Sequence, residues 1–288
     1  MKNKCFIGLG VMGSSMATHL RKGGYPLSLF NRTEEKSKKW VRKHGGISCK
    51  SPAEAALHCD MVFLCVGKDE DVRSVLSGDD GVLQSLQKGS IVVDHTTTSA
   101  TLAKEMGKVC LKKEIFFLDA PVSGGQVGAE EGKLTVMAGG DQKAFKRSKK
   151  VVDLYSKSYV RMGDIGSGQL TKMVNQICLA GLIQSLAEGI HFSKKAGLDT
   201  KKVIKVISQG AAQSWQMDNR WQTMLKDDYE HGFAVDWMRK DLGIAMEEGK
   251  RNNSKLDLVK LVDKYYSEIQ KINGRFDTSS LLKRLDSA

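Results

Sequence analysis

The 288-residue sequence predicts an α/β domain with a doubly wound, mostly parallel sheet, followed by an all-helical domain. Up to about residue 162, short β-branched runs alternate with helix-length amphipathic segments, which supply the crossovers that parallel strands need. After Gly163 the strand pattern largely stops. The three prolines, Pro26, Pro52 and Pro121, all precede that point, so no later proline interrupts a helix.

Seven segments have the length and residue content of strands. They are residues 4–8, 27–30, 61–66, 90–94, 115–119, 134–138 and 158–162. Helix-length segments lie between most of them, which favours parallel pairing for the earlier strands. We expect the last two strands to be antiparallel additions to the sheet.

The helical domain is predicted from segments 167–196, 201–208, 234–251 and 256–272. The first of these is apolar nearly all round, so we expect it to be buried between domains or between subunits. With the boundary near residues 163–168, the chain divides into a domain of residues 1–163 and a domain of residues 164–288.

Composition and spacing exclude several classes of partner. The 45 Lys and Arg exceed the 33 Asp and Glu, for a formal net charge of +12, but they are dispersed and no recognition motif accompanies them. We therefore expect that the chain binds small anionic molecules and does not bind nucleic acid.

No run reaches the roughly 18 apolar residues of a membrane span. The six cysteines form no CxxC pair, which predicts a reducing, cytoplasmic location. The histidines lack metal-ligand spacing, so no metal is expected.

A glycine-rich turn joins the first predicted strand to the first helix. Its residues, Gly8, Leu9, Gly10, Val11, Met12 and Gly13, spell G-x-G-x-x-G. In this position the pattern permits a tight turn, close approach of the backbone to a pyrophosphate, and donation from the helix N-terminus. The alternative is a purely structural turn, which the strand–turn–helix context disfavours.

The second strand ends at Asn31, Arg32 and Thr33, about where a dinucleotide site holds its ribose-binding residue. An acidic residue at this place would bind a free 2′-hydroxyl. Here Arg32 supplies a guanidinium and Thr33 a hydroxyl instead, and both groups can bind the 2′-phosphate of NADP. The alternative is that Arg32 is simply a surface arginine.

Two further segments could hold a substrate. Residues 119–125 follow a strand and combine Pro121, Ser123, Gly124 and Gly125, so backbone N–H groups and a hydroxyl could surround a carboxylate, although a plain turn fits equally well. In the apolar helix, Lys172 and Asn175 share a face. Burial would disfavour the charged form of the lysine and suit it to proton transfer, unless its amine reaches solvent.

Together these motifs resemble the β-hydroxyacid dehydrogenase family, which includes 3-hydroxyisobutyrate dehydrogenases, tartronate semialdehyde reductases and glyoxylate/succinic semialdehyde reductases. The resemblance covers the whole chain and extends to Phe233 and the pair Lys240-Asp241. It implies a Rossmann-like N-terminal domain and an all-α C-terminal domain for substrate binding and dimerisation, as in 6-phosphogluconate dehydrogenase. The active site is then expected in the cleft between them.

The resemblance also implies roles for individual residues. Lys172 would be the catalytic acid/base, Ser123, Gly124 and Gly125 would hold the substrate carboxylate, and Asn175 and Gln176 would orient the substrate. Val66 and Thr96 would line the nicotinamide, while Phe233 and Lys240 would close over the cofactor. The chain departs from the family at Gln176, where many dehydrogenases have Asn, and at His95, which we leave outside the catalytic set.

The sequence therefore predicts an oxidoreductase that interconverts a small β-hydroxy acid and its semialdehyde by hydride transfer. NADP(H) is the expected cofactor, with NAD(H) as the alternative, and a homodimer or homotetramer is expected. A competing hypothesis is a non-catalytic dinucleotide-binding adaptor on the same fold, which Lys172 disfavours.

Overall fold

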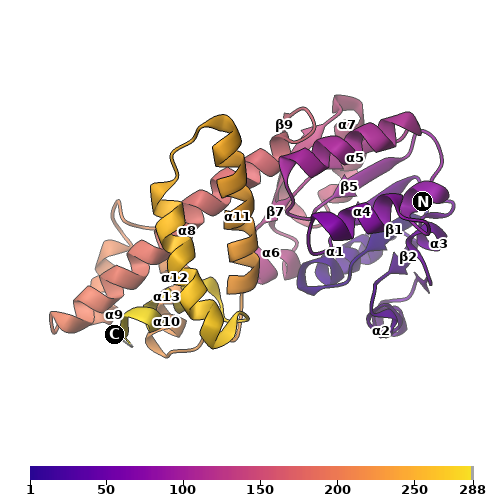
Figure 1. Cartoon of the computed structure of the whole chain (residues 1–288). Helices are drawn as coiled ribbons and strands as arrows, with labels where there is room; N and C mark the ends of the chain where they lie inside the picture. The colour runs from indigo at the N-terminus through magenta and orange to yellow at the C-terminus, as the bar shows by residue number, and fades with distance from the viewer. Residues whose placement is uncertain (287–288) are drawn as a thin grey trace. The chain divides into compact units, whose positions relative to one another are not determined.

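A computed structural model describes residues 1–286 of the chain (Figure 1). The chain divides into two compact units, the first comprising Met1–Lys172 and the second beginning at Met173. The final two residues of the predicted second domain, 287 and 288, lie outside the described part. Each unit is built around its own core.

Within the described residues, the first unit holds one nine-stranded sheet, in the order β3-β2-β1-β4-β5-β6-β8-β7 with β9 paired to β8. The pairings from β3 through β6 are parallel. Strand β8 is antiparallel to β6, and β9 is parallel to β8. Both strands therefore run antiparallel to β1–β6, which confirms the two predicted antiparallel additions. The strand bounds are β1 Lys4–Ile7, β2 Leu27–Phe30, β3 Ile47–Ser48, β4 Met61–Leu64, β5 Ile91–Asp94, β6 Phe116–Asp119, β7 Val122–Ser123, β8 Leu134–Gly140 and β9 Ser156–Gly163.

The two-residue strands β3 and β7 were not among the predicted strands. Two residues are too short to show the alternation by which a strand is recognised in a sequence. Each is paired to a longer neighbour, β3 to β2 and β7 to β8, so tertiary pairing determines them.

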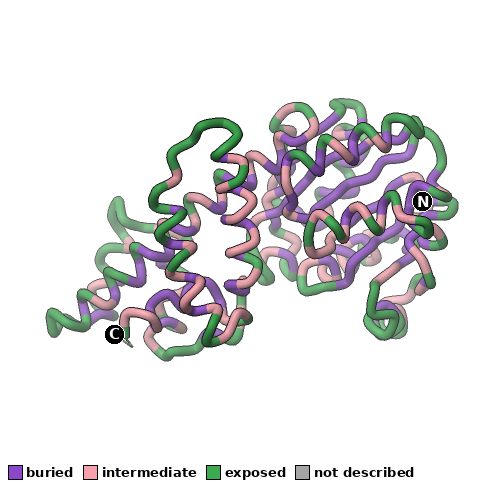
Figure 2. Tube along the Cα trace, in the orientation of Figure 1, coloured by how far each residue is buried: buried purple, intermediate pink, exposed green. Residues whose placement is uncertain are grey.

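Helices cover both faces of the sheet because successive side chains of its strands point to opposite sides. Phe6 and Phe63 belong to the core on one face, with helices α1, α2, α6 and α7. Ile7 and Leu64 belong to the core on the other face, with α3, α4 and α5. Strands β1, β4 and β5 are buried at every residue, whereas β3 and most of β9 are not, and Figure 2 shows the buried segments running through the middle of this unit. The helix bounds are α1 Val11–Lys22, α2 Glu34–His44, α3 Pro52–Ala56, α4 Asp69–Ser77, α5 Ala100–Lys112, α6 Gly125–Glu130 and α7 Gln142–Val152, with a short 3-10 turn η1 at Val82–Gln84.

Strand β1 occupies the point where the strand order reverses, because it pairs with β2 on one side and β4 on the other. In open parallel sheets, ligands bind beyond the carboxyl ends of the strands at such a point. The segments that follow β1, β2, β4, β5 and β6 all leave the sheet at this edge. The topology therefore gathers the predicted cofactor residues of the first unit at one edge.

The regular elements of the second unit are all helices within its described residues, and an isolated antiparallel bridge joins Ala234 to Asp277. Its core includes Ile183, Met238, Leu242, Val262 and Tyr266. The helices are α8 Ser167–Lys195, which begins in the first unit, α9 Thr200–Ile207, α10 Trp215–Leu225, α11 Val235–Asn252, α12 Asp257–Asn273 and α13 Leu281–Asp286, with a 3-10 turn η2 at Thr278–Ser280. Helices α8, α9, α11 and α12 match predicted segments, whereas α10 and α13 were not predicted.

Helix α8 buries only part of its apolar surface against the core of its own unit. Ile183, Leu186 and Ile190 are buried in the helical core. Val174, Leu182 and Phe192 are 60%, 43% and 71% exposed. One side of the helix packs against the core of its own unit, and the other side presents apolar residues to solvent.

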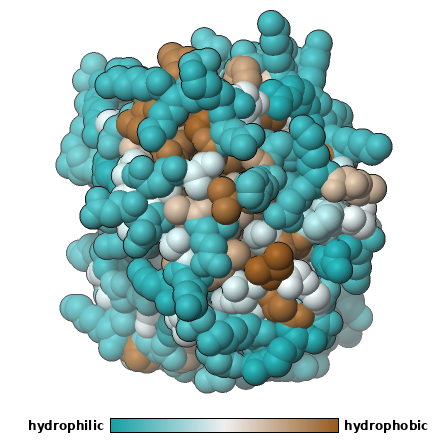
Figure 3. Space-filling view, turned by 90° about the vertical axis from the view of Figure 1, so that its right-hand side faces the viewer, coloured by the Kyte–Doolittle hydropathy of each residue, from teal (hydrophilic) through white to brown (hydrophobic). Residues whose placement is uncertain are grey.

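The face of the molecule in Figure 3 is mostly hydrophilic, with apolar residues in small separate groups. The lysines of α2 and α7 are all exposed, so they form solvated helix faces. Among residues 1–286, no helix combines the length and apolar character needed to cross a membrane.

Candidate functional site

The glycine-rich turn after β1 has two glycines fixed by packing and one that faces open space. Gly8 has φ +95°, and a Cβ there would lie 2.2 Å from the Cys65 carbonyl oxygen. A Cβ on Gly13 would lie 1.9 Å from the Gly8 carbonyl oxygen. For Gly10, apart from its two chain neighbours, no heavy atom of the described residues lies within 4 Å of such a Cβ. The turn therefore leaves backbone at Gly10, the N-cap of α1, accessible to a ligand.

Asn31 braces this turn against the end of β2. Its Oδ1 accepts a hydrogen bond from the Leu9 N–H at 2.9 Å, and its Nδ2 donates to the Thr33 carbonyl oxygen at 2.9 Å. The Leu9 side chain is buried in the core, while Val11 at the start of α1 is 56% exposed and Met12 is half-buried. Asn31 thus holds the two predicted cofactor segments together.

Arg32 stands at the surface beside this brace. Its side chain is 88% exposed, and its Nη1 lies 3.1 Å from Asp71 Oδ1 on α4. Such an exposed ion pair holds the guanidinium weakly, so an anionic ligand could compete for it. Thr33 is the N-cap of α2, and its side chain makes no capping hydrogen bond there.

Thr96 links the ends of β4 and β5. Its Oγ1 accepts a hydrogen bond from the Val66 N–H at 3.0 Å, and its own N–H donates to Asp94 at 2.9 Å. Gln169 of α8 donates from Nε2 to the Thr96 carbonyl oxygen at 2.7 Å and accepts from the Thr98 N–H at 3.0 Å. Thr96 is 2% exposed, so it holds the Val66 backbone from inside the fold.

Ser123, Gly124 and Gly125 form a second turn with accessible backbone. Ser123 ends β7 and is half-buried. Gly124 and Gly125 have φ values of +130° and +62°. Apart from its chain neighbours and the backbone of its own helix, no heavy atom of residues 1–286 lies within 4 Å of a Cβ placed on Gly125. Positive φ at both positions requires glycine. The open space resembles that at Gly10.

Asp119 fixes the start of α8, the helix that carries Lys172. Its two carboxylate oxygens accept the N–H groups of Gly166 and Gln169 at 2.7 and 2.9 Å. A Cβ on Gly168 would lie 2.5 Å from the Asp119 carbonyl oxygen, so the helix packs directly on the end of β6. Lys172, one turn later, is 8% exposed. The lysine is therefore buried on a helix whose first turn is anchored to the sheet.

Two buried carboxyls support this edge of the sheet, and burial is the main influence on both. Desolvation raises the pKa of Asp94 to about 7, against the opposing effect of hydrogen bonds from Thr96. Burial likewise raises the pKa of Asp119 to about 6, while the N–H groups of Gly166 and Gln169 oppose the rise.

His95 is a core residue. Its Nδ1 lies 2.6 Å from the Ala120 carbonyl oxygen, and its Nε2 lies 2.8 Å from the Tyr155 hydroxyl. Burial lowers the pKa of His95 to about 4, so the ring is neutral near pH 7. Its two ring nitrogens are engaged inside the fold.

In the second unit, a polar chain runs from Asn175 to Lys240. Asn175 Nδ2 donates to Gln176 Oε1 at 2.8 Å, and Gln176 Nε2 donates to Asp241 Oδ2 at 2.7 Å. Lys240 Nζ lies 3.2 Å from Asp241 Oδ1. Gln176 is 1% exposed, and its side-chain amide links Asn175 to Asp241. Phe233 lies on the loop before α11 and is half-buried.

Sequence reasoning did not find Gln169, or the anchoring contacts of Asp119, Asp241 and Asp277. Asp119 and Asp241 do lie inside motifs that were recognised. Gln169 carries no local signal, since its partners Thr96 and Thr98 are distant in the sequence. Asp277 has a near partner in Ser279, but the Phe233 N–H that it also accepts lies 44 residues away. No three His, Cys, Asp or Glu side chains within residues 1–286 come together as a metal site.

Comparison with known families covers nearly the whole chain. A family described as the NAD binding domain of 6-phosphogluconate dehydrogenase matches residues 3–163. A family described as NAD-binding of NADP-dependent 3-hydroxyisobutyrate dehydrogenase matches residues 166–285.

Individual proteins agree with these matches. The chain is 55% identical over 289 residues to an "Uncharacterized oxidoreductase" of Shewanella frigidimarina, covering 100% of this chain and 99% of that protein. It is 40% identical to "Probable 3-hydroxyisobutyrate dehydrogenase-like 1, mitochondrial" of Arabidopsis thaliana, covering 98% and 84%. The structure of the Mycobacterium tuberculosis 3-hydroxyisobutyrate dehydrogenase with L-serine superposes with a TM-score of 0.89 at 26% identity, covering 99% of each chain.

Proposed function

The chain belongs to the β-hydroxyacid dehydrogenase family, and from that premise we propose an NADP(H)-preferring enzyme that interconverts a small β-hydroxy acid and its semialdehyde. The observation that carries the proposal is the buried Lys172 on a helix anchored to the sheet by Asp119. Burying a lysine amine costs free energy. Buried ionisable groups of this kind are common at active sites, where they act as general acids or bases.

The residues of the first unit fit a dinucleotide. The open space at Gly10 and the N-terminus of α1 suit a pyrophosphate, and Arg32 suits a 2′-phosphate. Val66 and Thr96 would line the nicotinamide ring, which supplies the donor or acceptor of hydride when bound. Phe233 and Lys240 of the second unit would contact the same nucleotide.

Lys172 would hold the proton that the reacting oxygen gains on reduction or loses on oxidation. Ser123, Gly124 and Gly125 would bind the substrate carboxylate through the hydroxyl and accessible backbone. Asn175, held by Gln176, would orient the substrate. Anchoring the carboxylate while Lys172 shares a proton with the reacting oxygen restricts the substrate to a short acid.

The test is steady-state kinetics with short semialdehydes and 3-hydroxy acids, each with NADPH/NADP and NADH/NAD. Succinic, methylmalonate and tartronate semialdehydes and glyoxylate are compared with propanal and butanal at matched concentrations. We expect the carboxylates to be favoured in kcat as well as KM, because anchoring also orients the reaction. Equal kcat/KM for the uncharged aldehydes would refute the carboxylate anchor, and cofactor binding without any turnover would favour an adaptor.

We also propose that the exposed side of α8 associates with a second copy of the chain, as a homodimer or within a homotetramer. Val174, Cys178 and Leu182 are spaced four residues apart on one exposed side of this helix. Light scattering after size exclusion measures the mass in solution. Leu182→Glu should lower that mass, and a monomeric wild-type protein would contradict the proposal.

A further inference from the structure

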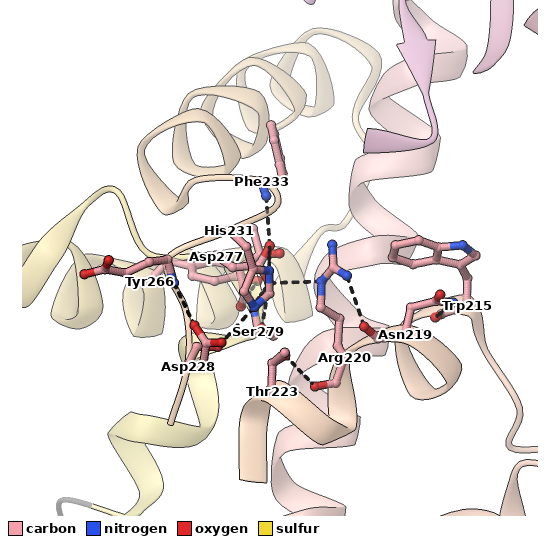
Figure 4. Close-up of polar contacts among 12 residues, drawn as sticks. Trp215, Asn219, Arg220, Thr223, Asp228, His231, Phe233, Tyr266, Asp277 and Ser279 are labelled. Atoms are coloured by element: carbon pink, nitrogen blue, oxygen red, sulfur yellow. Dashed lines mark hydrogen bonds and ion pairs between the residues drawn. The ribbon is translucent and has the colours of Figure 1, made fainter. Parts of the chain in front are cut away.

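The carboxylate of Asp277 is fully buried in the helical unit and lies outside the predicted site. Its Oδ1 accepts the N–H and the hydroxyl of Ser279 at 3.0 and 2.6 Å, and its Oδ2 accepts the Phe233 N–H at 2.8 Å. Arg220 Nε lies 3.3 Å from Oδ1 (Figure 4). A buried carboxylate is costly unless it is paired and hydrogen-bonded, and here both conditions are met.

The loop before α11 bends around this carboxylate. Gly232 has φ +70°, and a Cβ there would lie 2.1 Å from Asp277 Oδ2, so only glycine fits. The Phe233 carbonyl oxygen accepts the Thr278 N–H at 2.9 Å. Both backbone polar groups of Phe233 are therefore held by residues 277 and 278. Figure 4 shows the Phe233 ring pointing away from the carboxylate.

The same carboxylate is connected to α10. Arg220 is 17% exposed at its side chain, and its guanidinium carbon lies 4.9 Å from the centre of the Trp215 ring. His231 Nδ1 is 4.0 Å from Asp277 Oδ2. Asp277 thus joins the loop that carries Phe233 to Arg220 of α10, 13 residues earlier in the chain.

We propose that Asp277 is a positioning residue for cofactor binding, which acts by fixing the backbone from which Phe233 projects. This inference rests on the proposed contact between Phe233 and the nicotinamide nucleotide. Asp277 itself touches neither cofactor nor substrate in this assignment. A merely structural carboxylate would affect stability alone, whereas a positioning carboxylate affects NADPH affinity and does so only while the Phe233 ring is present.

The experiment is a double-mutant cycle on the full-length protein, with Asp277→Asn, Phe233→Ala and the double variant. NADPH binding is measured by fluorescence titration, and each variant is checked by circular dichroism and thermal melting. The matched control is Glu268→Gln. Arg284 Nε lies 2.7 Å from Glu268, and the Arg284 guanidinium carbon lies 3.6 Å from the centre of the Tyr265 ring, so this is a second Arg–carboxylate pair beside an aromatic ring in the same unit.

Loss of a charge-assisted hydrogen bond should raise the NADPH Kd of Asp277→Asn roughly tenfold. The KM for NADPH should rise with it, while kcat at saturating NADPH changes little. In the Phe233→Ala background the same substitution should add less than about twofold, since coupled residues are not additive. Glu268→Gln should lower the melting temperature without changing the Kd.

An unchanged Kd in folded Asp277→Asn, or an equal effect with and without the Phe233 ring, would overturn the inference. If Asp277→Asn does not fold, Ser279→Ala decides, because it removes one donor and keeps the charge. That variant should raise the Kd severalfold, and an unchanged Kd overturns the inference. A wild-type protein that fails to bind NADPH would instead refute the proposed function.

Discussion

In the sheet-containing unit, the candidate ligand contacts are mainly backbone groups in short glycine-rich turns, whereas in the helical unit they are side chains held by partners far along the chain. Gly10 and Gly125 both present backbone beside open space. Asn175 depends on a chain through Gln176 to Asp241, 65 residues from Gln176. Phe233 depends on Asp277, 44 residues away.

The difference follows from how the two folds create a site. Parallel strands deliver their carboxyl ends to one edge, so turns that follow them are brought together by topology alone. Helices have no such shared edge, and their polar side chains must be oriented by individual hydrogen bonds and ion pairs. Substitutions in the two units should therefore fail in different ways.

The largest effect is expected at Lys172, the last residue of the first unit. Lys172→Met should lower kcat by roughly 10²–10⁴, because it removes the group that exchanges a proton with the reacting oxygen. NADPH affinity, measured by fluorescence titration, should change little. Near-normal turnover in a folded Lys172→Met protein would exclude the lysine from the chemistry.

The glycine turn can be tested with a matched pair of alanine substitutions. Gly13→Ala places a Cβ against the Gly8 carbonyl oxygen and should destabilise the protein by more than about 3 kcal/mol. Gly10→Ala meets open space at φ −72°, so the melting temperature should stay close to that of wild type while NADPH affinity falls. Equal melting temperatures for the two variants would refute the assignment of packing to Gly13 and ligand approach to Gly10.

Arg32→Ala tests the one charged side chain in the proposed nucleotide contacts of the first unit. Charge-assisted hydrogen bonds contribute about 1.5–3 kcal/mol, so the substitution should remove roughly tenfold to hundredfold discrimination between NADPH and NADH. The measurement is the ratio of kcat/KM for the two cofactors. Glu35→Gln, which removes a surface charge two residues beyond Thr33, is the control, and a wild type that prefers NADH would contradict the assignment.

The smallest effect is a pH dependence of stability from Asp94. Its folded pKa of about 7 lies above the ordinary value of 3.8, so the folded state keeps the proton longer and stability falls as pH rises between these values. Asp94→Asn removes this dependence and can still accept the Thr96 N–H. Relative to wild type, the variant should gain about 2 kcal/mol between pH 5 and pH 8.

Thermal melting of both proteins at several pH values checks this. His95 changes stability in the opposite sense, because its lowered pKa makes the folded state lose stability as pH falls below 6.5. The comparison of Asp94→Asn with wild type cancels that contribution. A difference in stability that is constant across the range would show that Asp94 is ionised throughout.

The sequence by itself determined the alternation of strands and helices, the two antiparallel additions, and the glycine turn at residues 8–13. These features are local, because hydrophobic periodicity and glycine spacing depend only on residues close together in the sequence. The short strand β7 and helix α10 were missed because pairing and packing, rather than pattern, define them. Their formation depends on β8 and on the helical core.

Only the tertiary structure decided which buried polar groups orient the candidate site. Asp119 and Gly166 are 47 residues apart in the sequence, and no local pattern links them. The pairs Gln176–Asp241 and Phe233–Asp277 are separated by 65 and 44 residues. A hydrogen bond needs two atoms near 3 Å, and that proximity arises only when the chain has folded. Candidate binding residues could therefore be proposed from the sequence, whereas the tertiary structure decides which hydrogen-bond partners hold them in place.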